Sequence, residues 1–249
     1  MANGDTVALL DAQGLTRRFG GLLAVSEMSM QVNDREIVGL IGPNGAGKST
    51  TFNLLSGFLK PTAGRLHLFG KDVTGRSPEY ISRLGLIRTF QHGSLMRSMT
   101  VEHNILVGTL GRLARAGRKE QLQRVVEAAD LVGLRDVLHE EAGSLPHGMQ
   151  RLVSIAIAYV SRPRLLCLDE PLTGLNQTEV GVVLDVFRRI RDEYGSSILL
   201  VEHNMKAVMQ TCDRLYVLHH GRLLASGTPA EVRANEEVLA AYLGTANVH

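Results

Sequence analysis

The sequence predicts an α/β fold with a mainly parallel sheet covered by helices, an antiparallel β part near the amino terminus and a helical insert in the middle of the chain. Beyond residue 163, short apolar runs typical of buried strands alternate with stretches of helical length, which favours parallel strands joined by helices. Before residue 41, short apolar runs are separated only by turns, which favours antiparallel pairing. Between residues 95 and 160 the apolar spacing is that of helices.

The length of 249 residues predicts one domain with sub-parts, because it is large for one simple domain and small for two. Hydrophobic residues make up 44% and charged residues 21%, which are ordinary values for a globular chain. The net charge of +2, the aromatic content of 4% and the lack of Trp provide neither the basic excess nor the stacking platforms of a nucleic-acid binder. We therefore expect no nucleic-acid partner.

Membrane segments and metal motifs are not expected. The apolar runs stay well below the roughly 18 residues needed to cross a bilayer. The first residues, MANGDTVALLDAQG, lack the basic start and long apolar stretch of a signal peptide. Cys167 and Cys212 are far apart in the sequence and suit a reducing compartment. These features predict a soluble, cytosolic chain that reaches a membrane only through a partner.

The elements of the first 90 residues follow from apolar runs and turn residues. A glycine-rich loop begins directly after the third apolar run, and the stretch beyond it has the length of a helix. The expected elements are strands Val7–Leu10, Ala24–Met30, Glu36–Ile41 and Leu86–Phe90, a short strand and turn over 64–74, and helices Ser49–Phe58 and 79–84.

Helical spacing dominates the next part of the chain. Leu122, Val125, Val126 and Ala129 fall at positions i, i+3, i+4 and i+7, which is one face of an amphipathic helix. The later expected elements are helices Met149–Ser161, Thr178–Tyr194 and Met205–Thr211, strands Leu165–Leu168, Ser197–Val201 and Leu215–Leu218, a turn at 219–221 between two short strands, and one short helix near 229–242.

Residues 42–50 read GPNGAGKST and fit the pattern G-x-x-x-x-G-K-[ST] between an expected strand and an expected helix. Glycines in such a loop let the backbone N–H groups surround phosphate oxygens, and the start of the helix adds its partial positive charge. Lys48 is expected to reach the β- and γ-phosphates, and the Ser49 hydroxyl to bind Mg²⁺. The alternative is a glycine-rich turn without a ligand. The candidate phosphate-binding residues are Gly42, Pro43, Asn44, Gly45, Ala46, Gly47, Lys48, Ser49 and Thr50.

Four further motifs follow in order along the chain. They are RTFQ at 88–91, LPHGMQR at 145–151, DEPLTGLN at 169–176 after the strand LLCL, and VEHNM at 201–205. Together with the phosphate loop they resemble the ATP-binding subunit of ABC transporters over nearly the whole chain. RFGG at 18–21 and three of these motifs, RTFQ, DEPLTGLN and VEHNM, are most similar to the branched-chain amino acid importer group.

The resemblance implies a P-loop NTPase core of the RecA-like type that uses ATP and Mg²⁺. It implies that Asp169 helps to hold Mg²⁺ through water and that Glu170 is the general base for the attacking water. It also implies that Gln91 touches Mg²⁺ and the water, and that His203 contacts the γ-phosphate. The alternatives are that Glu170 only caps a loop and that Gln91 is an ordinary polar residue at a strand end.

Two residues match positions that contact adenine in the family. Phe19 matches the aromatic ring that stacks on the base, and Val25 is a possible second wall. For both, simple packing within a strand is the alternative.

The signature loop of the family usually reads Leu-Ser-Gly-Gly-Gln, and this chain departs from it. The corresponding residues are Leu145, Pro146, His147, Gly148 and Met149, followed by Gln150. Pro146 has neither the hydroxyl nor the N–H that would reach a γ-phosphate, and a charge-assisted hydrogen bond is worth about 1.5–3 kcal/mol. Gly148 and the start of the following helix remain, so weakened phosphate recognition is expected. Asn176 also stands where aspartate is usual.

The resemblance implies several partners. Such ATPases work as head-to-tail pairs, so Pro146 would affect the ATP site of the partner, which is a second ABC ATPase in a homodimer or heterodimer. Permease subunits in the membrane would dock beside Gln91 and the helical subdomain, with 92–99 as a candidate docking edge. The alternative for 92–99 is ordinary contact within the core. A periplasmic solute-binding protein would act indirectly. The chain would then lie at the cytoplasmic face of the inner membrane.

The same resemblance implies a division of the single domain. Residues 1–90 and 163–249 would form the ATP core with its antiparallel β part, and 91–162 the mainly helical subdomain with the signature loop.

Several other functions stay open from the sequence. An exporter cassette, for example of the lipopolysaccharide type, would carry similar motifs. A non-transport ABC ATPase of DNA repair or translation usually has two cassettes or an extra domain, and a GTPase or nucleotide kinase lacks the 145–151 motif. Within import, branched-chain amino acids, urea, short amides and related carboxylates are all candidate solutes.

Overall fold

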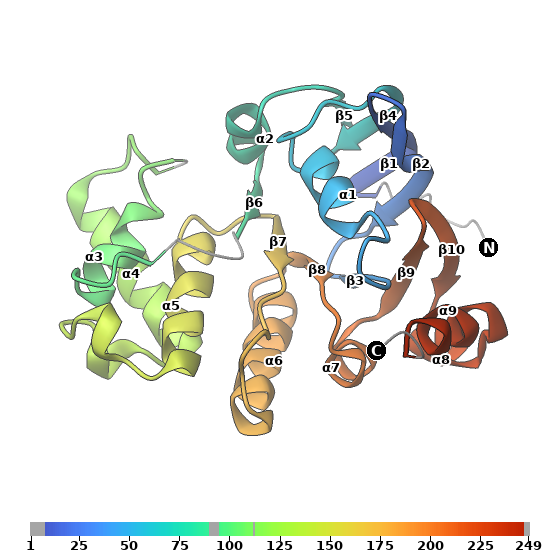
Figure 1. Cartoon of the computed structure of the whole chain (residues 1–249). Helices are drawn as coiled ribbons and strands as arrows, with labels where there is room; N and C mark the ends of the chain where they lie inside the picture. Colours follow the sequence, from blue (N-terminus) through green and yellow to red (C-terminus); the bar gives the residue numbers. More distant parts are fainter. Residues whose placement is uncertain (1–7, 90–94, 112, 247–249) are drawn as a thin grey trace, which may run out of the picture.

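Two sheets organise the part of the chain that the computed structural model describes, residues 8–89, 95–111 and 113–246 (Figure 1). The first is a six-stranded sheet of order β10-β9-β3-β8-β7-β6. Its strands are β3 (Ile37–Ile41), β6 (Leu86–Arg88), β7 (Leu165–Asp169), β8 (Ser197–Val201), β9 (Arg214–His219) and β10 (Arg222–Gly227). All neighbouring strands pair in parallel except β9 and β10, so the predicted α/β fold with a mainly parallel sheet is confirmed.

The second sheet is antiparallel and has the order β2-β1-β4-β5. Its strands are β1 (Leu10–Phe19), β2 (Leu22–Val32), β4 (Ala63–Leu68) and β5 (Lys71–Asp72). The prediction of a strand over Val7–Leu10 missed most of β1. Buried and partly exposed side chains alternate along β1, so its polar face hides it from a search for apolar runs.

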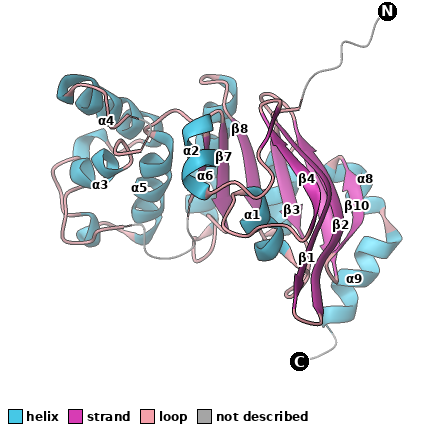
Figure 2. Ribbon diagram, turned by 90° about the horizontal axis from the view of Figure 1, so that it is seen from above, coloured by secondary structure: helices cyan, strands magenta, loops and turns pink. Residues whose placement is uncertain are grey.

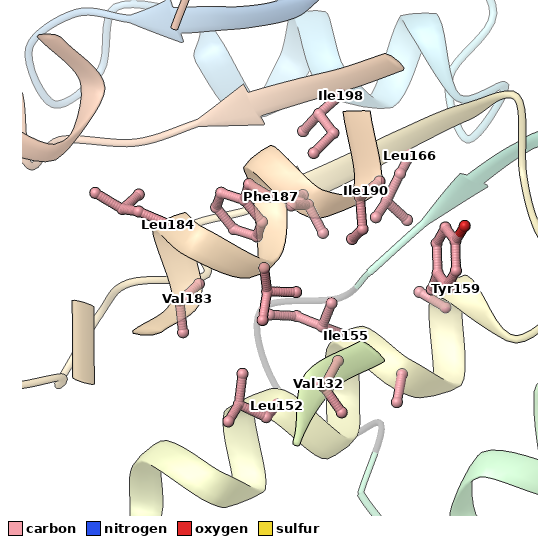
Figure 3. Close-up of a cluster of buried hydrophobic side chains, with 14 of the residues drawn as sticks. Val132, Leu152, Ile155, Tyr159, Leu166, Val183, Leu184, Phe187, Ile190 and Ile198 are labelled. Atoms are coloured by element: carbon pink, nitrogen blue, oxygen red, sulfur yellow. The ribbon is translucent and has the colours of Figure 1, made fainter. Parts of the chain in front are cut away.

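The central strands are fully buried because both of their faces are covered. Alternate residues of β3 enter two different hydrophobic clusters, Ile37 and Ile41 in one and Val38 and Leu40 in the other. The first cluster lies toward α5 (His147–Tyr159) and α6 (Gln177–Asp192), as Figure 3 shows for Leu152, Ile155, Phe187 and Ile190. The second cluster lies toward the antiparallel sheet and α1 (Lys48–Leu55).

Helices α3 (Val101–Val107), α4 (Arg118–Val132) and α5 form a lobe at the opposite end of the molecule from the antiparallel sheet (Figure 2). Two short 3₁₀ helices, η1 (Arg135–Val137) and η2 (Ala142–Ser144), connect α4 to α5. The predicted apolar face of α4 is confirmed, because Val125 and Ala129 are buried. The lobe and α6 share one hydrophobic cluster, and the proposed division of the chain at residues 91 and 162 stays a prediction.

The remaining helices are α2 (Pro78–Leu84), α7 (Met205–Thr211), α8 (Pro229–Ala234) and α9 (Glu236–Ala246). Among them, α7 confirms the predicted bounds, α2 begins one residue earlier than predicted, and two helices stand where one was predicted. The prediction of one helix near 229–242 is wrong. Asn235 is extended and its side-chain oxygen accepts hydrogen bonds from the N–H groups of Glu237 and Val238, so it ends α8 and starts α9.

Candidate nucleotide-binding site

The phosphate loop connects β3 to α1 and depends on glycines at close contacts. Gly42 and Gly47 have φ values of 151° and 99°, which side-chain-bearing residues rarely adopt. A Cβ atom on Gly42 would lie 2.2 Å from the carbonyl oxygen of Leu218, and one on Gly47 would lie 2.8 Å from that of Ala24. The loop is therefore packed against β2 and β9 through its own backbone, which explains why the sequence has glycine there.

Lys48, the first residue of α1, is held inside this loop. Its Nζ donates hydrogen bonds to the carbonyl oxygens of Gly42 at 2.7 Å and Pro43 at 2.9 Å. Burial lowers the pKa of Lys48, and the negative charge of Glu170 opposes that shift. The ammonium group is thus fixed at the centre of the loop, near where a phosphate on the loop would sit.

An open cleft of about 570 Å³ lies over the loop. Its size is within the usual range of about 300–1,000 Å³ for small-molecule sites. Of the expected phosphate-binding residues, only Gly42 and Pro43 lie outside the lining. The lining residues are Leu22, Leu23, Ala24, Asn44, Gly45, Ala46, Gly47, Lys48, Ser49, Thr50, Glu170, His220 and Gly221.

Asp169 ends β7 and forms an ion pair with Arg88 on β6. The Arg88 Nη2 to Asp169 Oδ2 distance is 2.9 Å, and each side chain is only 10% exposed. Arg88 also donates to Ser56 at the end of α1 and lies 4.4 Å from the ring centre of Phe52. Arg88 therefore links Asp169 to the helix that follows the phosphate loop. The sequence analysis missed it, although it opens the motif RTFQ.

The described residues fit a Mg²⁺ ion that is shared with a bound nucleotide. The Asp169 carboxylate and the exposed Ser49 hydroxyl offer the oxygen ligands that Mg²⁺ prefers. Within the described ranges no group of three His, Cys, Asp or Glu residues could hold a metal ion. Such a group is not needed, because Mg²⁺ in nucleotide sites is usually bound by one or two carboxylates and by the phosphates.

Glu170 and His203 meet at the carboxyl edge of the parallel sheet. Asp169 on β7 is in register with Val201 on β8, so the residues that follow each strand emerge side by side. The distance from Glu170 Oε2 to His203 Nδ1 is 4.0 Å. The Glu170 N–H donates to the carbonyl oxygen of Val201 at 2.9 Å, and its φ of 46° turns its side chain out of the strand direction. Glu170 lines the cleft, whereas His203 lies beside Glu170 but is not one of the lining residues.

A further carboxylate, which the sequence analysis missed, joins the segments that carry these two residues. Glu202 is fully buried. Its Oε1 accepts a hydrogen bond from the Leu172 N–H at 2.7 Å, and its Oε2 accepts from the N–H groups of His203 at 3.1 Å and Asn204 at 3.4 Å. Burial raises the pKa of Glu202, and these amide bonds oppose the shift. A charged residue directly after the apolar run SILLV was the available signal.

The predicted signature loop begins α5, on the other side of residues 170–176. Pro146 and His147 are exposed, whereas Leu145 and Gly148 are buried. A Cβ on Gly148 would lie 2.5 Å from a carboxylate oxygen of Glu179, so α5 packs closely on α6 there. Gln150 donates to the Leu145 carbonyl oxygen at 2.8 Å and fixes the entry to the helix. These contacts are internal to the chain and leave the 146–147 corner at the surface.

Comparison with known proteins identifies the family. The ABC transporter model matches residues 25–173, and the branched-chain amino acid ATP-binding cassette transporter model matches residues 222–247. The chain belongs to the ABC transporter family. It is 43% identical to the high-affinity branched-chain amino acid transport ATP-binding protein LivG of Salmonella typhimurium, over 96% of this chain and 98% of that protein. BraF of Pseudomonas aeruginosa is 39% identical over the same shares.

A solved structure supports the same assignment. The ADP conformation of MJ1267, an ATP-binding cassette of an ABC transporter, has a TM-score of 0.88 and 28% identity, and the match covers 96% of this chain and 100% of that one. The lipopolysaccharide export ATP-binding protein LptB of Acidithiobacillus ferridurans is 36% identical over 95% of this chain and 97% of that protein. The prediction of an ATP-hydrolysing subunit of an ABC importer is confirmed by the LivG and BraF relatives and by the carboxyl-terminal model.

The two residues of this ABC ATPase that are predicted to contact adenine are not among the lining residues of the cleft, and their contact with adenine stays a prediction. Val25 is fully buried in the core behind Gly47, so its side chain belongs to the packing of β2 and not to the surface of the cleft. Phe19 is 43% exposed at the end of β1, with the Arg17 guanidinium 4.6 Å from its ring centre. The cleft instead meets β2 at its first residues, including Leu22, which is 67% exposed.

The residues expected to meet the permeases are only partly described. Gln91 and 92–94 of the expected docking edge lie outside the described residues. Leu95 packs against the hydrophobic cluster of the helical lobe, which favours ordinary contact within the core at that position.

A second cleft of about 770 Å³ lies between α2 and the segment after α3. It is lined by Glu79, Ser82, Arg83, Leu110, Gly111, Ala114 and Arg115.

Proposed function

We propose that this ABC ATPase binds ATP with Mg²⁺ in the cleft over the phosphate loop and drives the uptake of a small solute. The observation that carries the site is that Lys48 and Glu170 line the same cleft, with His203 within 4.0 Å of Glu170. The names of LivG and BraF support branched-chain amino acids as the solute class, with urea, short amides and related carboxylates as the alternatives.

The phosphate loop would hold the triphosphate by charge and by backbone N–H groups. Lys48 would exchange its carbonyl partners at Gly42 and Pro43 for phosphate oxygens, which carry full negative charge and make stronger bonds. The first turn of α1 would add its partial positive charge. Because the loop is already packed against its neighbours, little reorganisation would be needed at binding.

Asp169 and Ser49 would hold Mg²⁺, with Gln91 as the further residue that the family resemblance indicates. The ion, when bound, would neutralise charge on the β- and γ-phosphates. Arg88 keeps the Asp169 carboxylate at the sheet edge, since the pair is nearly buried and is also tied to α1. The carboxylate would therefore stay within reach of the loop.

Glu170 would accept a proton from the attacking water, and His203 would donate a hydrogen bond to the γ-phosphate. The roles suit the geometry, because the two side chains face each other across the carboxyl edge of β7 and β8. A carboxylate that lines the cleft and lies opposite a positively charged loop can orient water at the terminal phosphate.

Two such chains would act head to tail, with the signature loop of one completing the ATP site of the other. The exposed 146–147 corner is where a partner's nucleotide would meet this chain.

The permeases would dock in the cleft between α2 and the segment after α3. The lining of this cleft includes the 65% exposed side chain of Leu110 and the charged side chains of Glu79 and Arg83. In the described ranges no helix is long and apolar enough to cross a bilayer. Docking on permeases would hold the chain at the cytoplasmic face of the inner membrane.

The test of this function is isolation of the native complex from membranes by a tag on this chain, followed by mass spectrometry. Two permeases, a second ABC ATPase and a periplasmic binding protein that binds a branched-chain amino acid are the expected result. A binding protein specific for urea or an amide would move the solute to that class. Recovery with a lipid-export membrane subunit would overturn the import function.

A further inference from the structure

The segment 170–176 is held from two sides by side chains of other elements. Directly after β8, the Glu202 carboxylate accepts the N–H of Leu172 at 2.7 Å. From the signature helix α5, Arg151 donates to the carbonyl oxygen of Thr173 at 3.3 Å. The backbone of two consecutive residues is thus held by side chains of opposite charge, and the charges of Arg151 and Glu202 also attract each other.

Glu202 binds a second segment with its other oxygen. The N–H groups of His203 and Asn204 both donate to Oε2, and Asn204 in turn caps α7 by accepting from the Ala207 N–H at 3.1 Å. One carboxylate therefore joins the loop after β7 to the loop after β8, and His203 lies on the second of these loops.

Packing does not explain a carboxylate at this position. The strand before Glu202 is fully buried and consists of Ser197, Ile198, Leu199, Leu200 and Val201. A buried charge is costly unless hydrogen bonds compensate it, and an apolar side chain of similar volume would fill the same space without that cost. What an apolar side chain could not provide is three acceptor contacts that span two loops.

We propose that Glu202 is a positioning residue that makes the segment 170–176 and the His203 loop move as one unit. A shift of α5 by a nucleotide on the signature loop would pass through Arg151 and Thr173 to Leu172, and through Glu202 to His203. Occupancy of the partner's ATP site would in this way reach the catalytic groups of this chain. The inference rests on the proposed role of His203 at the γ-phosphate.

The experiment compares ATP hydrolysis by the full-length wild type, Glu202→Gln, His203→Ala and the double variant. Glutamine has the shape of glutamate but one acceptor oxygen fewer, so it can hold only one of the two loops. We expect kcat to fall about 10- to 100-fold while KM for ATP stays nearly constant, because misplacement of a catalytic group by a fraction of an ångström acts on the transition state. In the His203→Ala background the same change should cost almost nothing further.

Glu36→Gln is the matched control. Glu36 also accepts a backbone N–H, that of Asn33 at 2.7 Å, and pairs with Arg214, but it precedes β3, at the end of the strand away from the phosphate loop. The control should leave kcat unchanged. Equal losses of kcat from Glu202→Gln with and without His203 would overturn the inference, and so would a wild-type kcat for that variant.

Hydrogen exchange of the backbone amides separates this inference from the proposed function. In Glu202→Gln the amides of 172, 203 and 204 should exchange faster together, and faster exchange of only one loop would contradict the joint movement. If Glu202→Gln fails to fold, Glu202→Asp serves instead, because it keeps the charge and shortens the reach by one methylene. A wild-type chain that does not hydrolyse ATP would overturn the proposed function, whereas the exchange measurement would still report on Glu202.

Discussion

The phosphate loop and the signature loop, which we propose to contact opposite sides of a nucleotide, are built differently. In the phosphate loop, glycines pack against β2 and β9, and Lys48 is hydrogen-bonded by the carbonyl oxygens of its own loop. At the signature loop, α5 starts directly after Pro146, whose ring carries no group able to cap the helix, and the 146–147 corner is exposed. The first region is organised without a ligand, whereas the second, in the proposed pair, would depend on the nucleotide that a partner chain brings.

This difference indicates where each region can tolerate change. A loop that binds phosphates by backbone N–H groups needs a defined backbone, so its glycines and lysine cannot be exchanged freely. A loop that adds a few contacts to a ligand held elsewhere loses only those contacts when a residue changes. Replacement of the usual serine by Pro146 is consistent with that weaker demand.

The largest expected effect is that of Glu170→Gln on the phosphate-loop side. Loss of a general base typically costs about 100- to 10,000-fold in rate, so phosphate release should fall by that factor. ATP affinity, measured by equilibrium binding, should be kept or increased, because the repulsion between the carboxylate and the phosphates disappears. Glu120→Gln, an exposed position on α4, is the control and should hydrolyse ATP at the wild-type rate. Undiminished hydrolysis by Glu170→Gln would contradict the assignment.

The next effect is on stability and concerns the link between Asp169 and α1. Arg88→Met removes one partner of a nearly buried ion pair, which costs about 3–5 kcal/mol of unfolding free energy. The matched control is Arg162→Met, because Arg162 pairs with Glu127 at 2.9 Å but both side chains are more than 30% exposed. Exposed pairs contribute about 0–1 kcal/mol. Urea unfolding of both variants measures the difference, and equal losses would show that burial of the Arg88 pair has no special effect.

The sequence predicted the sheet, most helices and the phosphate-loop part of the cleft because their signals are local. Apolar runs marked β3, β7 and β8, and the motif G-x-x-x-x-G-K-[ST] marked the loop between a strand and a helix. Strand β1 was mostly missed because exposed and partly exposed side chains alternate with buried ones along it. The contacts of Arg88 and Glu202 could not be predicted, since their partners lie 81 and 30 residues away in the chain. The placement of Val25 in the core likewise depends on how the phosphate loop lies over β2.

A smaller effect is expected at the signature loop. Pro146→Ser restores a hydroxyl that could donate to the partner's γ-phosphate, and it also supplies a preferred N-cap for α5. If the introduced hydroxyl donates to the phosphate, the new hydrogen bond would stabilise the γ-phosphate during hydrolysis by about 1.5–3 kcal/mol. Turnover in the assembled complex should then rise about tenfold or more. The isolated chain should bind ATP as before, because Pro146 lies outside its own cleft. Unchanged turnover of the complex would show that the loop does not limit hydrolysis.

The smallest effect concerns Asn176, which separates a role in stability from one in catalysis. Its side-chain oxygen accepts hydrogen bonds from the N–H groups of Thr178 at 2.9 Å and Glu179 at 3.0 Å. The Glu179 carboxylate in turn accepts one from the Asn176 N–H, which completes a capping box for α6. Asparagine caps a helix as well as aspartate does, so the departure from the family's aspartate costs the fold little. Asn176→Ala should lower the unfolding free energy by about 1 kcal/mol, and Thr228→Ala in the capping box of α8 should cost a similar amount. Asn176→Asp should keep the stability of the wild type, so a change of turnover in that variant alone would assign the residue at 176 a role in the paired site beyond its cap.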